Sequence, residues 1–291
     1  MSTQSTPAIV TTVPPLALSR PSYLMCAPAF YEVNYVINPW MADNIHASSR
    51  ERASEQWRNL YSELTQIADV ERIDPQPGLP DMVFTANAGL ERYGTVVLSS
   101  FLYPERRGEE SYFHQWFEQR GYHVLELSRL TPFEGEGDAL FSDDGARLWA
   151  GFGTRSVKAS HAFLQRAWDI EVVPLHLQDP RFYHLDTCFA PLEDGYVLYY
   201  PQAFDHKSQA EIERYYPAEK RIAVSEADAM RFACNAINID GTIILNRISD
   251  ELSKQLEARG FRVIQVELGE FLKAGGAAKC LVMRLSPRRP V

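Results

Sequence analysis

The sequence predicts an α/β fold in which five β-β-α-β repeats close into a ring. Three observations support this prediction: hairpin-like segments recur along the chain, an amphipathic segment follows each of them, and a short apolar segment comes next. Steps of 56, 48, 46 and 46 residues separate the equivalent points of the repeats, which are Phe84, Leu140, Cys188, Cys234 and Cys280. An ordinary mixed α/β sheet with accidental spacing stays open as the alternative.

Four segments have the pattern of β-hairpins. Each contains two stretches of apolar or β-branched residues, divided by an Asp-Gly pair or another turn with glycine. The segments are VFTANAGLERYGTVVLSS from Val83, ALFSDDGARLWAGFG from Ala139, TCFAPLEDGYVLYYP from Thr187 and CNAINIDGTIILNR from Cys234.

Helices and short strands are expected between the hairpins. Apolar residues recur at helical spacing after each hairpin, as at Phe113, Trp116 and Phe117, and again at Leu252 and Leu256. A short strand-like segment follows each helical one: YHVLEL, IEVVPLHL, RIAVS and FRVIQVEL. A helix around Trp57, Leu60, Tyr61 and Leu64 leads in the same way to VERID.

The two ends of the folded region are predicted to pair with each other. CLVMRLS at 280–286 has no hairpin partner downstream, and SYLMCAP at 22–28 has none upstream. Pairing these segments closes the ring and removes the open sheet edges that favour aggregation. We therefore expect one domain over residues 21–291, preceded by a disordered tail over residues 1–20.

Composition favours a small-molecule partner. The net charge is −9, from 29 basic and 38 acidic residues, and no run of Lys and Arg exceeds a pair, which argues against nucleic acid and anionic membranes. No apolar run reaches the roughly 20 residues of a membrane span, and the N-terminus lacks the basic start of a signal peptide. A cytoplasmic location is expected, and the possibility of a homo-oligomer stays open.

The four cysteines are widely spaced and form no Cys-x-x-Cys motif, so neither a zinc site nor a disulfide framework is indicated. No metal and no cofactor is expected. Cys26, Cys188 and Cys234 lie in apolar segments and are expected to be small core residues.

Polar residues recur at the same place in each repeat, and a ring brings such positions together on its axis. They include a cysteine, a histidine and several carboxylates, which suggests a thiol nucleophile with acid–base assistance. The residues are Asp81, Asn87, Glu134, Asp138, His184, Asp186, Asn235 and Cys280.

Four motifs in this order resemble those of a known family. DxVFTxN, FEGxGD, HLDT and GGxxxC are similar to motifs of the guanidine-modifying, or amidinotransferase, superfamily, whose fold is the pentein. The resemblance covers roughly residues 22–286 and is greatest to arginine dihydrolases of the cyanobacterial type. It implies five ββαβ units about a pseudo-fivefold axis, in agreement with the repeat described above.

The resemblance also implies roles for individual residues. Cys280 matches the nucleophile that attacks the guanidinium carbon, His184 matches the general acid and base, and Glu134 matches the carboxylate that orients the histidine. Because FEGEGD has one residue more than the deiminase motif, Glu136 is an alternative to Glu134. Expected substrate-binding residues are Asn87, Asp186, Arg106, Arg155 and Asn38.

The residue at position 87 bears on the product. Arginine deiminases usually carry an aspartate here, whereas an asparagine offers both a donor and an acceptor for the neutral ureido group of citrulline. This difference favours a second hydrolysis, which yields ornithine, carbon dioxide and a second ammonia. The alternatives are a dimethylarginine hydrolase, an arginine deiminase, an amidinotransferase and a pentein that binds without catalysis.

Overall fold

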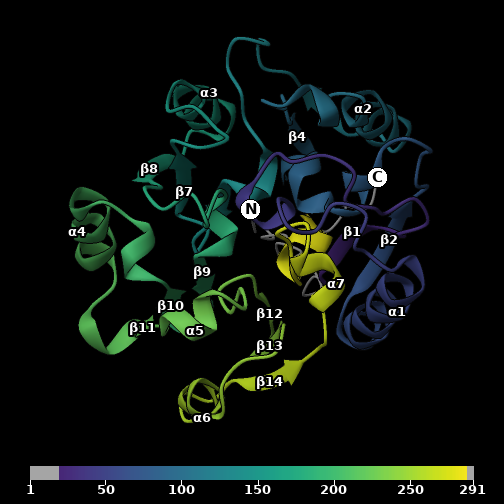
Figure 1. Ribbon diagram of the computed structural model, residues 1–291. Coiled ribbons are helices and arrows are strands. Elements are labelled where there is room, and N and C mark those ends of the chain that lie inside the picture. The colour runs from purple at the N-terminus through teal and green to yellow at the C-terminus, as the bar shows by residue number, and fades with distance from the viewer. Residues whose placement is uncertain (1–19, 287–291) are drawn as a thin grey trace, which may run out of the picture.

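Five three-stranded sheets surround a central axis in the computed structural model, which describes residues 20–286 (Figure 1). In every sheet an inner strand pairs antiparallel with a middle strand, which pairs parallel with an outer one. From inner to outer the sheets are β3 (Gly89–Arg92), β4 (Thr95–Leu98) and β5 (His123–Leu125); β6 (Ala139–Phe141), β7 (Arg147–Phe152) and β8 (Glu171–His176); β9 (Phe189–Leu192), β10 (Tyr196–Tyr199) and β11 (Arg221–Ala223); β12 (Ile237–Ile239), β13 (Thr242–Leu245) and β14 (Arg262–Gln265); and β15 (Met283–Leu285), β1 (Ser22–Cys26) and β2 (Asp69–Ile73).

A helix connects the middle and outer strands of every sheet and lies on the outside of the ring (Figure 1). These helices are α1 (Arg50–Ile67), α2 (Glu109–Gln119), α3 (Ala159–Trp168), α4 (His206–Tyr215) and α6 (Asp250–Glu257). Two neighbouring parallel strands require such a crossover, because the chain must return from the end of the first strand to the opposite end of the sheet, where the second strand begins. Two shorter helices, α5 (Glu226–Ala229) and α7 (Gly269–Leu272), lie nearer the axis.

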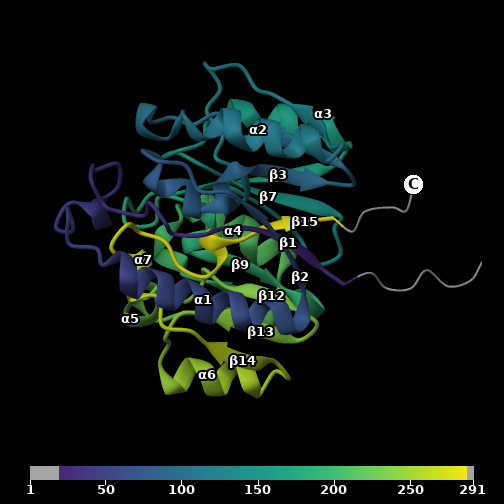
Figure 2. The same cartoon turned by 90° about the vertical axis from the view of Figure 1, so that its right-hand side faces the viewer.

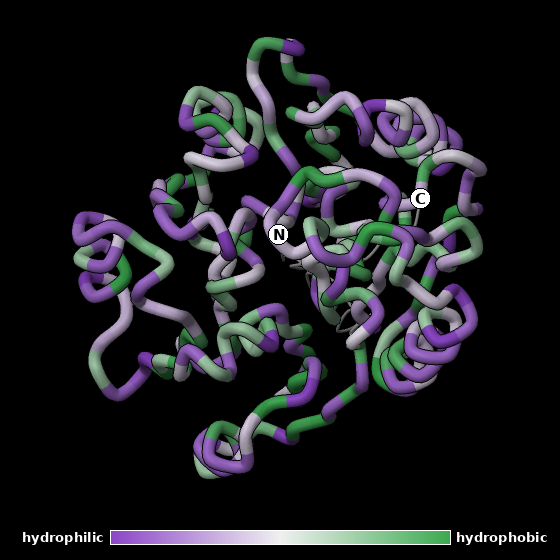
Figure 3. The backbone as a smooth tube through the Cα atoms, in the orientation of Figure 1, coloured by the Kyte–Doolittle hydropathy of each residue, from purple (hydrophilic) through white to green (hydrophobic). Residues whose placement is uncertain are grey.

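Side-chain caps and amphipathic faces explain why the outer helices form where they do. Ser49, Asp205 and Ser249 precede α1, α4 and α6, and each accepts a hydrogen bond from a backbone N–H of the first turn. Hydrophilic and hydrophobic residues alternate along the helices in Figure 3, as expected of helices with one exposed face.

The ring closes between the two ends of the described chain, as the sequence predicts. Strand β1 pairs antiparallel with β15, and Leu24 lies opposite Met283. Figure 2 shows the two strands side by side. The fifth repeat is thus assembled from both ends of the chain, which confirms the predicted closure.

Four of the five inner strands begin later than the sequence pattern suggests, whereas β6 begins at Ala139 as expected. The expected strand residues Val83–Ala88 form 3-10 turns instead, over Pro80–Val83 and Thr85–Ala88. Similar turns precede three other inner strands, at Gly135–Gly137, Leu185–Thr187 and Lys279–Leu281. The inner strands start at Gly89, Ala139, Phe189, Ile237 and Met283, so the structural period is 50, 50, 48 and 46 residues.

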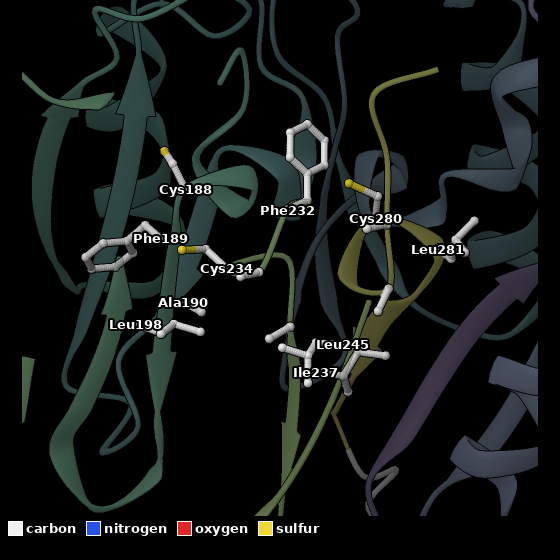
Figure 4. Packing of buried hydrophobic residues seen from close by; sticks show 14 of the residues in the cluster. Cys188, Phe189, Ala190, Leu198, Phe232, Cys234, Ile237, Leu245, Cys280 and Leu281 are labelled. Carbon is white, nitrogen blue, oxygen red and sulfur yellow. The ribbon is translucent and has the colours of Figure 1, made fainter. Parts of the chain in front are cut away.

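The core surrounds the axis and includes the three cysteines expected there. Cys26, Cys188 and Cys234 are each at most 1% exposed and free. Figure 4 shows Cys188 and Cys234 in the apolar packing around Phe189. No helix within residues 20–286 is long and apolar enough to cross a membrane. The tail predicted for residues 1–20 lies, except for Arg20, outside the described residues.

Candidate active site

The turns before the inner strands converge on one end of the axis and enclose a small cavity. Its lining includes five residues that the sequence predicts for the site: Asn38, Asn87, Arg106, Arg155 and Cys280. The free volume is about 10 Å³, which leaves room for one water molecule. Of the other three predicted residues, Glu134 and Asp186 contact the lining residues Arg155 and Cys280, and His184 contacts Glu134.

Cys280 is 3% exposed, and two polar side chains lie next to its thiol. Asn235 donates from Nδ2 to Sγ at 3.1 Å, and Sγ lies 3.4 Å from Oδ2 of Asp186. Burial raises the pKa of the Cys280 thiol well above its usual value, and the Asp186 carboxylate raises it further. The thiol is therefore protonated in the ligand-free protein, and a bound cation would favour its ionisation.

Two glycines before Cys280 allow the chain to pass close to aromatic rings. Gly275 has a φ of 80°, and a Cβ there would lie 2.8 Å from the hydroxyl of Tyr183. A Cβ on Gly276 would lie 2.4 Å from Cε1 of Phe84. The GGAAKC segment thus carries its glycines because larger residues would collide with the wall of the cavity.

His184 is held by a buried acid. Its Nε2 lies 2.8 Å from Oε2 of Glu134, and Arg155 donates from Nη1 to the same oxygen at 2.9 Å. Burial raises the pKa of Glu134, but the charges of Arg155 and His184 outweigh burial and hold the pKa well below its usual value. An ionised Glu134 orients the imidazole and stabilises its protonated form.

Asn87 has its amide orientation set by two neighbours. Arg106 donates from Nη1 to Oδ1 at 2.8 Å, and Nδ2 donates to the carbonyl of Glu134 at 3.1 Å. Arg106 is also paired bidentately with Glu109, through two hydrogen bonds of 2.8 Å. Each end of the Asn87 amide can form one further hydrogen bond to a ligand.

Two buried carboxylates at this end of the axis carry an oxygen without a hydrogen-bond partner. These oxygens are Oδ1 of Asp81 and Oδ1 of Asp186. Asp81 lines the cavity, while Asp186 contacts the thiol. Burial raises the pKa of Asp186 to about 7, despite the opposing charge of Lys279. Unpartnered buried acceptors are unfavourable, so both are suited to a cationic ligand.

Glu136, the alternative acid of the FEGEGD motif, has other partners. Lys279 donates from Nζ to its Oε2 at 2.5 Å, and the backbone N–H of Arg284 donates to both of its oxygens. No hydrogen bond joins Glu136 to the described imidazole of His184. The geometry therefore favours Glu134 as the partner of the histidine.

Asn38 contributes to the cavity through its local structure. Its Oδ1 caps the turn Pro39–Met41, and its Nδ2 donates to the carbonyl of Ala274 at 3.0 Å. The side chain thus joins two segments that cover the cavity. Among residues 20–286 no group of three or more His, Cys, Asp or Glu is arranged to hold a metal ion.

Three residues of the site have no assigned role in the sequence-based prediction. Asp81 and Asn235 belong to the polar positions that recur in the repeats, and that recurrence is the signal that could have identified them. Tyr183 donates from its hydroxyl to the carbonyl of Gly275 at 2.6 Å. No sequence signal distinguishes it, because aromatic residues are frequent in any core.

Comparisons with known proteins agree with this geometry. The family model "N,N dimethylarginine dimethylhydrolase, eukaryotic" matches residues 20–286. The bifunctional arginine dihydrolase/ornithine cyclodeaminase AgrE of Nostoc sp. is 56% identical over 268 residues, which are 92% of this chain and 38% of the relative. The corresponding protein ArgZ of Synechocystis sp. is 56% identical over 90% of this chain and 37% of its own length, so the chain spans less than two fifths of both relatives.

Three further comparisons cover most or nearly all of the matched chains. The N(G),N(G)-dimethylarginine dimethylaminohydrolase of Mycobacterium tuberculosis is 38% identical over 91% of this chain and 86% of its own. The N-terminal domain of ArgZ bound to product superposes with a TM-score of 0.92 at 54% identity, covering 93% and 99% of the two chains. A dimethylarginine dimethylaminohydrolase variant at 20% identity and a TM-score of 0.74 shares the fold. This chain is therefore a pentein and belongs to the N,N-dimethylarginine dimethylhydrolase family.

Proposed function

We propose that this chain hydrolyses L-arginine twice through a covalent intermediate on Cys280, releasing ornithine, carbon dioxide and two ammonia. The observation that carries the proposal is the combination of a buried thiol with unpartnered carboxylate oxygens on Asp186 and Asp81. This arrangement suits a substrate with two cationic groups. Asp186, beside the thiol, would bind the guanidinium, and Asp81 would bind the α-ammonium.

The arginines supply the complementary recognition of a carboxylate. Arg106 and Arg155 line the same cavity, and Nε of Arg155 is buried without a partner. A guanidinium N–H matches a carboxylate oxygen, so the unpartnered Nε of Arg155 favours a free amino acid over an amine without a carboxylate. The fork of Arg106 is paired with Glu109 and would bind a substrate carboxylate only after rearranging. Asn38 joins the covering segments near them.

The first hydrolysis uses the thiol and the imidazole. The bound guanidinium favours ionisation of Cys280, whose proton passes to water. The thiolate attacks the guanidinium carbon, and His184 gives a proton to the nitrogen that leaves as ammonia. His184 then takes a proton from the water that attacks the same carbon. The carbon–sulfur bond breaks and citrulline is formed. Glu134 keeps the imidazole oriented through both steps.

The second hydrolysis requires the neutral ureido group to stay in place. Asn87 can donate to its oxygen and accept from its nitrogen, whereas a carboxylate would face the oxygen without a proton to share. Leaving such a pair unmatched costs roughly 1–3 kcal/mol. A second attack by Cys280 on the ureido carbon then releases ammonia, and a second water breaks the carbon–sulfur bond. The carbamate formed in this way loses carbon dioxide and leaves ornithine.

The relatives support this assignment. Crystallised variants of ArgZ include a cysteine-to-serine variant with substrate and an asparagine-to-serine variant covalently bound to a reaction intermediate. The two substituted positions there are 193 residues apart, and Asn87 and Cys280 here are also 193 apart, since 280 − 87 = 193. An alanine variant of the cysteine in AgrE binds L-arginine.

A dimethylarginine hydrolase is the second candidate, because the mycobacterial relative matches along most of its length. The asparagine at position 87, which suits a second hydrolysis, favours the dihydrolase over this candidate. We also place the protein in the cytoplasm, consistent with its four free cysteines.

Product stoichiometry tests the proposal. The protein is incubated with L-arginine, and in parallel with dimethylarginine, while ornithine, citrulline and ammonia are quantified. We expect ornithine with two ammonia per arginine. Citrulline with one ammonia would identify a deiminase, and turnover of dimethylarginine alone would identify the second candidate.

The variant Asn87→Asp tests whether the second hydrolysis depends on the amide of Asn87. We expect this variant to release citrulline and to lose at least about 90% of its ornithine formation, because the carboxylate repels the ureido oxygen. Undiminished ornithine release from the folded variant would contradict the role assigned to Asn87.

A further inference from the structure

The side chain of Asn235 forms two hydrogen bonds with the candidate nucleophile, Cys280. Its Oδ1 accepts the backbone N–H of Cys280 at 3.0 Å, and its Nδ2 donates to Sγ at 3.1 Å. The same Nδ2 donates to the carbonyl of Asp186 at 3.1 Å, and the carbonyl of Asn235 accepts the N–H of Lys279 at 3.3 Å. The side chain is fully buried.

The orientation of the Asn235 amide follows from its two backbone partners. The N–H of Cys280 can only donate, so the atom facing it must be the amide oxygen. The carbonyl of Asp186 can only accept, so the atom facing it must be the amide nitrogen. The sulfur therefore receives an N–H from Asn235, whatever the protonation state of the thiol.

The direction of this hydrogen bond determines where the thiol proton points. A sulfur that accepts from Asn235 directs its own proton to its other polar neighbour, Oδ2 of Asp186 at 3.4 Å. We propose that Asn235 is a positioning residue that anchors Cys280 and stabilises its thiolate through the amide N–H. This inference rests on Cys280 as the nucleophile of the proposed function.

A neutral donor suits this position better than a charged one. A fixed cation would compete with the guanidinium for Asp186, whereas the amide stabilises the sulfur without repelling the substrate. When the guanidinium binds Asp186, its positive charge favours the thiolate, and the thiol proton passes to water. The N–H of Asn235 then remains as a donor to the sulfur throughout the attack.

The pH dependence of the thiol reflects several groups besides Asn235. Burial and Asp186 raise the pKa of Cys280, whereas hydrogen bonds from the backbone of Ala277 and from Asn235 lower it. The charged or titratable groups around the thiol and Asp186 are Tyr183, Lys279 and Glu136, with His184, Glu134 and Arg155 nearby. Only a change confined to Asn235 isolates its contribution.

The test compares Asn235→Asp with Asn246→Asp. Asp keeps the size of the side chain and an acceptor for Cys280 N–H, but has no N–H for the sulfur. Asn246 is a matched control, because it is also buried and joins two backbone groups, the carbonyl of Arg231 and the N–H of Leu268. Neither of its partners lies in the candidate site.

The readout is the rate of alkylation of Cys280 by iodoacetamide across pH, in which the thiolate displaces iodide. We expect Asn235→Asp to raise the pH midpoint by at least about one unit, and Asn246→Asp to leave it unchanged. Turnover of L-arginine should fall roughly 10- to 100-fold in kcat, with KM within about threefold, because the lost bond acts on the nucleophile.

Asn235→Ser is the second variant, and it keeps the site neutral. The pH midpoint of its alkylation should lie between those of the wild-type protein and Asn235→Asp. If Asn235→Asp does not fold, Asn235→Ser provides the test of the inference. Unchanged midpoints in the folded variants would overturn the inference. Because alkylation uses no arginine, a wrong substrate assignment would leave the shift intact and appear only in the product assay.

Discussion

At the scale of single residues, two glutamates of the FEGEGD motif that are two positions apart have different partners. Glu134 contacts His184 and Arg155, and Glu136 contacts Lys279. Glu134→Gln removes the charge that stabilises a protonated imidazole and leaves Arg155 buried without its anion. We expect kcat for L-arginine to fall roughly 100-fold or more, measured by ammonia release.

Glu136→Gln is the matched control for that substitution. It breaks the ion pair with Lys279 but leaves the contact of His184 with Glu134 in place. We expect kcat to stay within about tenfold of the wild-type value. A larger loss in Glu136→Gln than in Glu134→Gln would reverse the assignment.

Asp186 leads to a prediction about pH. Its pKa is raised to about 7 in the ligand-free protein, and a bound guanidinium favours the ionised form. Below pH 7 the ligand must displace a proton, so its affinity falls as the pH is lowered. We expect L-arginine to bind Cys280→Ser about tenfold more weakly at pH 6 than at pH 8, as measured by calorimetry.

Asp186→Asn is the control for this pH dependence, because an amide does not titrate in this range. Its affinity for L-arginine should be low and nearly constant from pH 6 to pH 8. A steep dependence that persists in this variant would assign the proton to another group.

The sequence was sufficient to predict that eight residues share one site, but not which side chains each of them contacts. The choice between Glu134 and Glu136 stayed open, because one turn of backbone decides which of them faces His184. The role of Asn235 depends on distances to Cys280 and Asp186, residues 45 and 49 positions away. Motif order contains no information on such contacts.

At the scale of elements, the hairpin turns were predictable, but of the inner strand starts only that of β6 at Ala139 was. Asp-Gly pairs mark turns because glycine and aspartate tolerate a positive φ. Val83–Ala88 has the composition of a strand, yet it forms 3-10 turns beside the axis. There, Gly137 lies so close that a Cβ would fall 2.3 Å from Nδ2 of Asn87. Crowding at the axis, rather than local propensity, sets these turns.

The turn between β12 and β13 provides a prediction for an element. Asp240 and Gly241 join these strands with φ values of 46° and 73°, and a Cβ on Gly241 would have no neighbour within 4 Å. The loss in Gly241→Ala is therefore purely conformational, and we expect about 1–2 kcal/mol in the free energy of unfolding. Denaturant melts provide the measurement.

Gly241→Asn serves as the comparison, because asparagine adopts the left-handed conformation more readily than alanine. Gly241→Asn should lose less stability than Gly241→Ala. Both variants should keep the wild-type kcat, because the turn follows β12 whereas Asn235 precedes it. Equal stability of the alanine variant and the wild-type protein would show that the turn relaxes.

At the scale of the whole molecule, the ring makes the site possible. Cys280 immediately precedes the strand that pairs with β1, so closure of the fold and placement of the nucleophile are one event. The closure was predictable from two unpaired strands at the chain ends. The small free volume of the cavity was not, because it depends on how segments between the repeats cover the axis.

The last prediction concerns the two chain segments that cover the cavity. One segment lines the cavity with Ile37, Asn38 and Met41, and a second lines it with Ala274 and Gly276. With a cavity of about 10 Å³, the lining must rearrange before L-arginine binds, and we expect these two segments to move apart. The hydrogen bond from Asn38 to the carbonyl of Ala274 couples them.

Hydrogen exchange with Cys280→Ser measures this motion. We expect L-arginine to slow exchange in residues 36–42 and 273–277 at least about fivefold, because the ligand ties both segments to the axis, while helix α1 (Arg50–Ile67) stays unchanged. Asn38→Ala removes the coupling bond and should speed exchange in both segments of the ligand-free protein. Protection spread evenly over the ring, or none in these segments, would mean that substrate reaches Cys280 by another path.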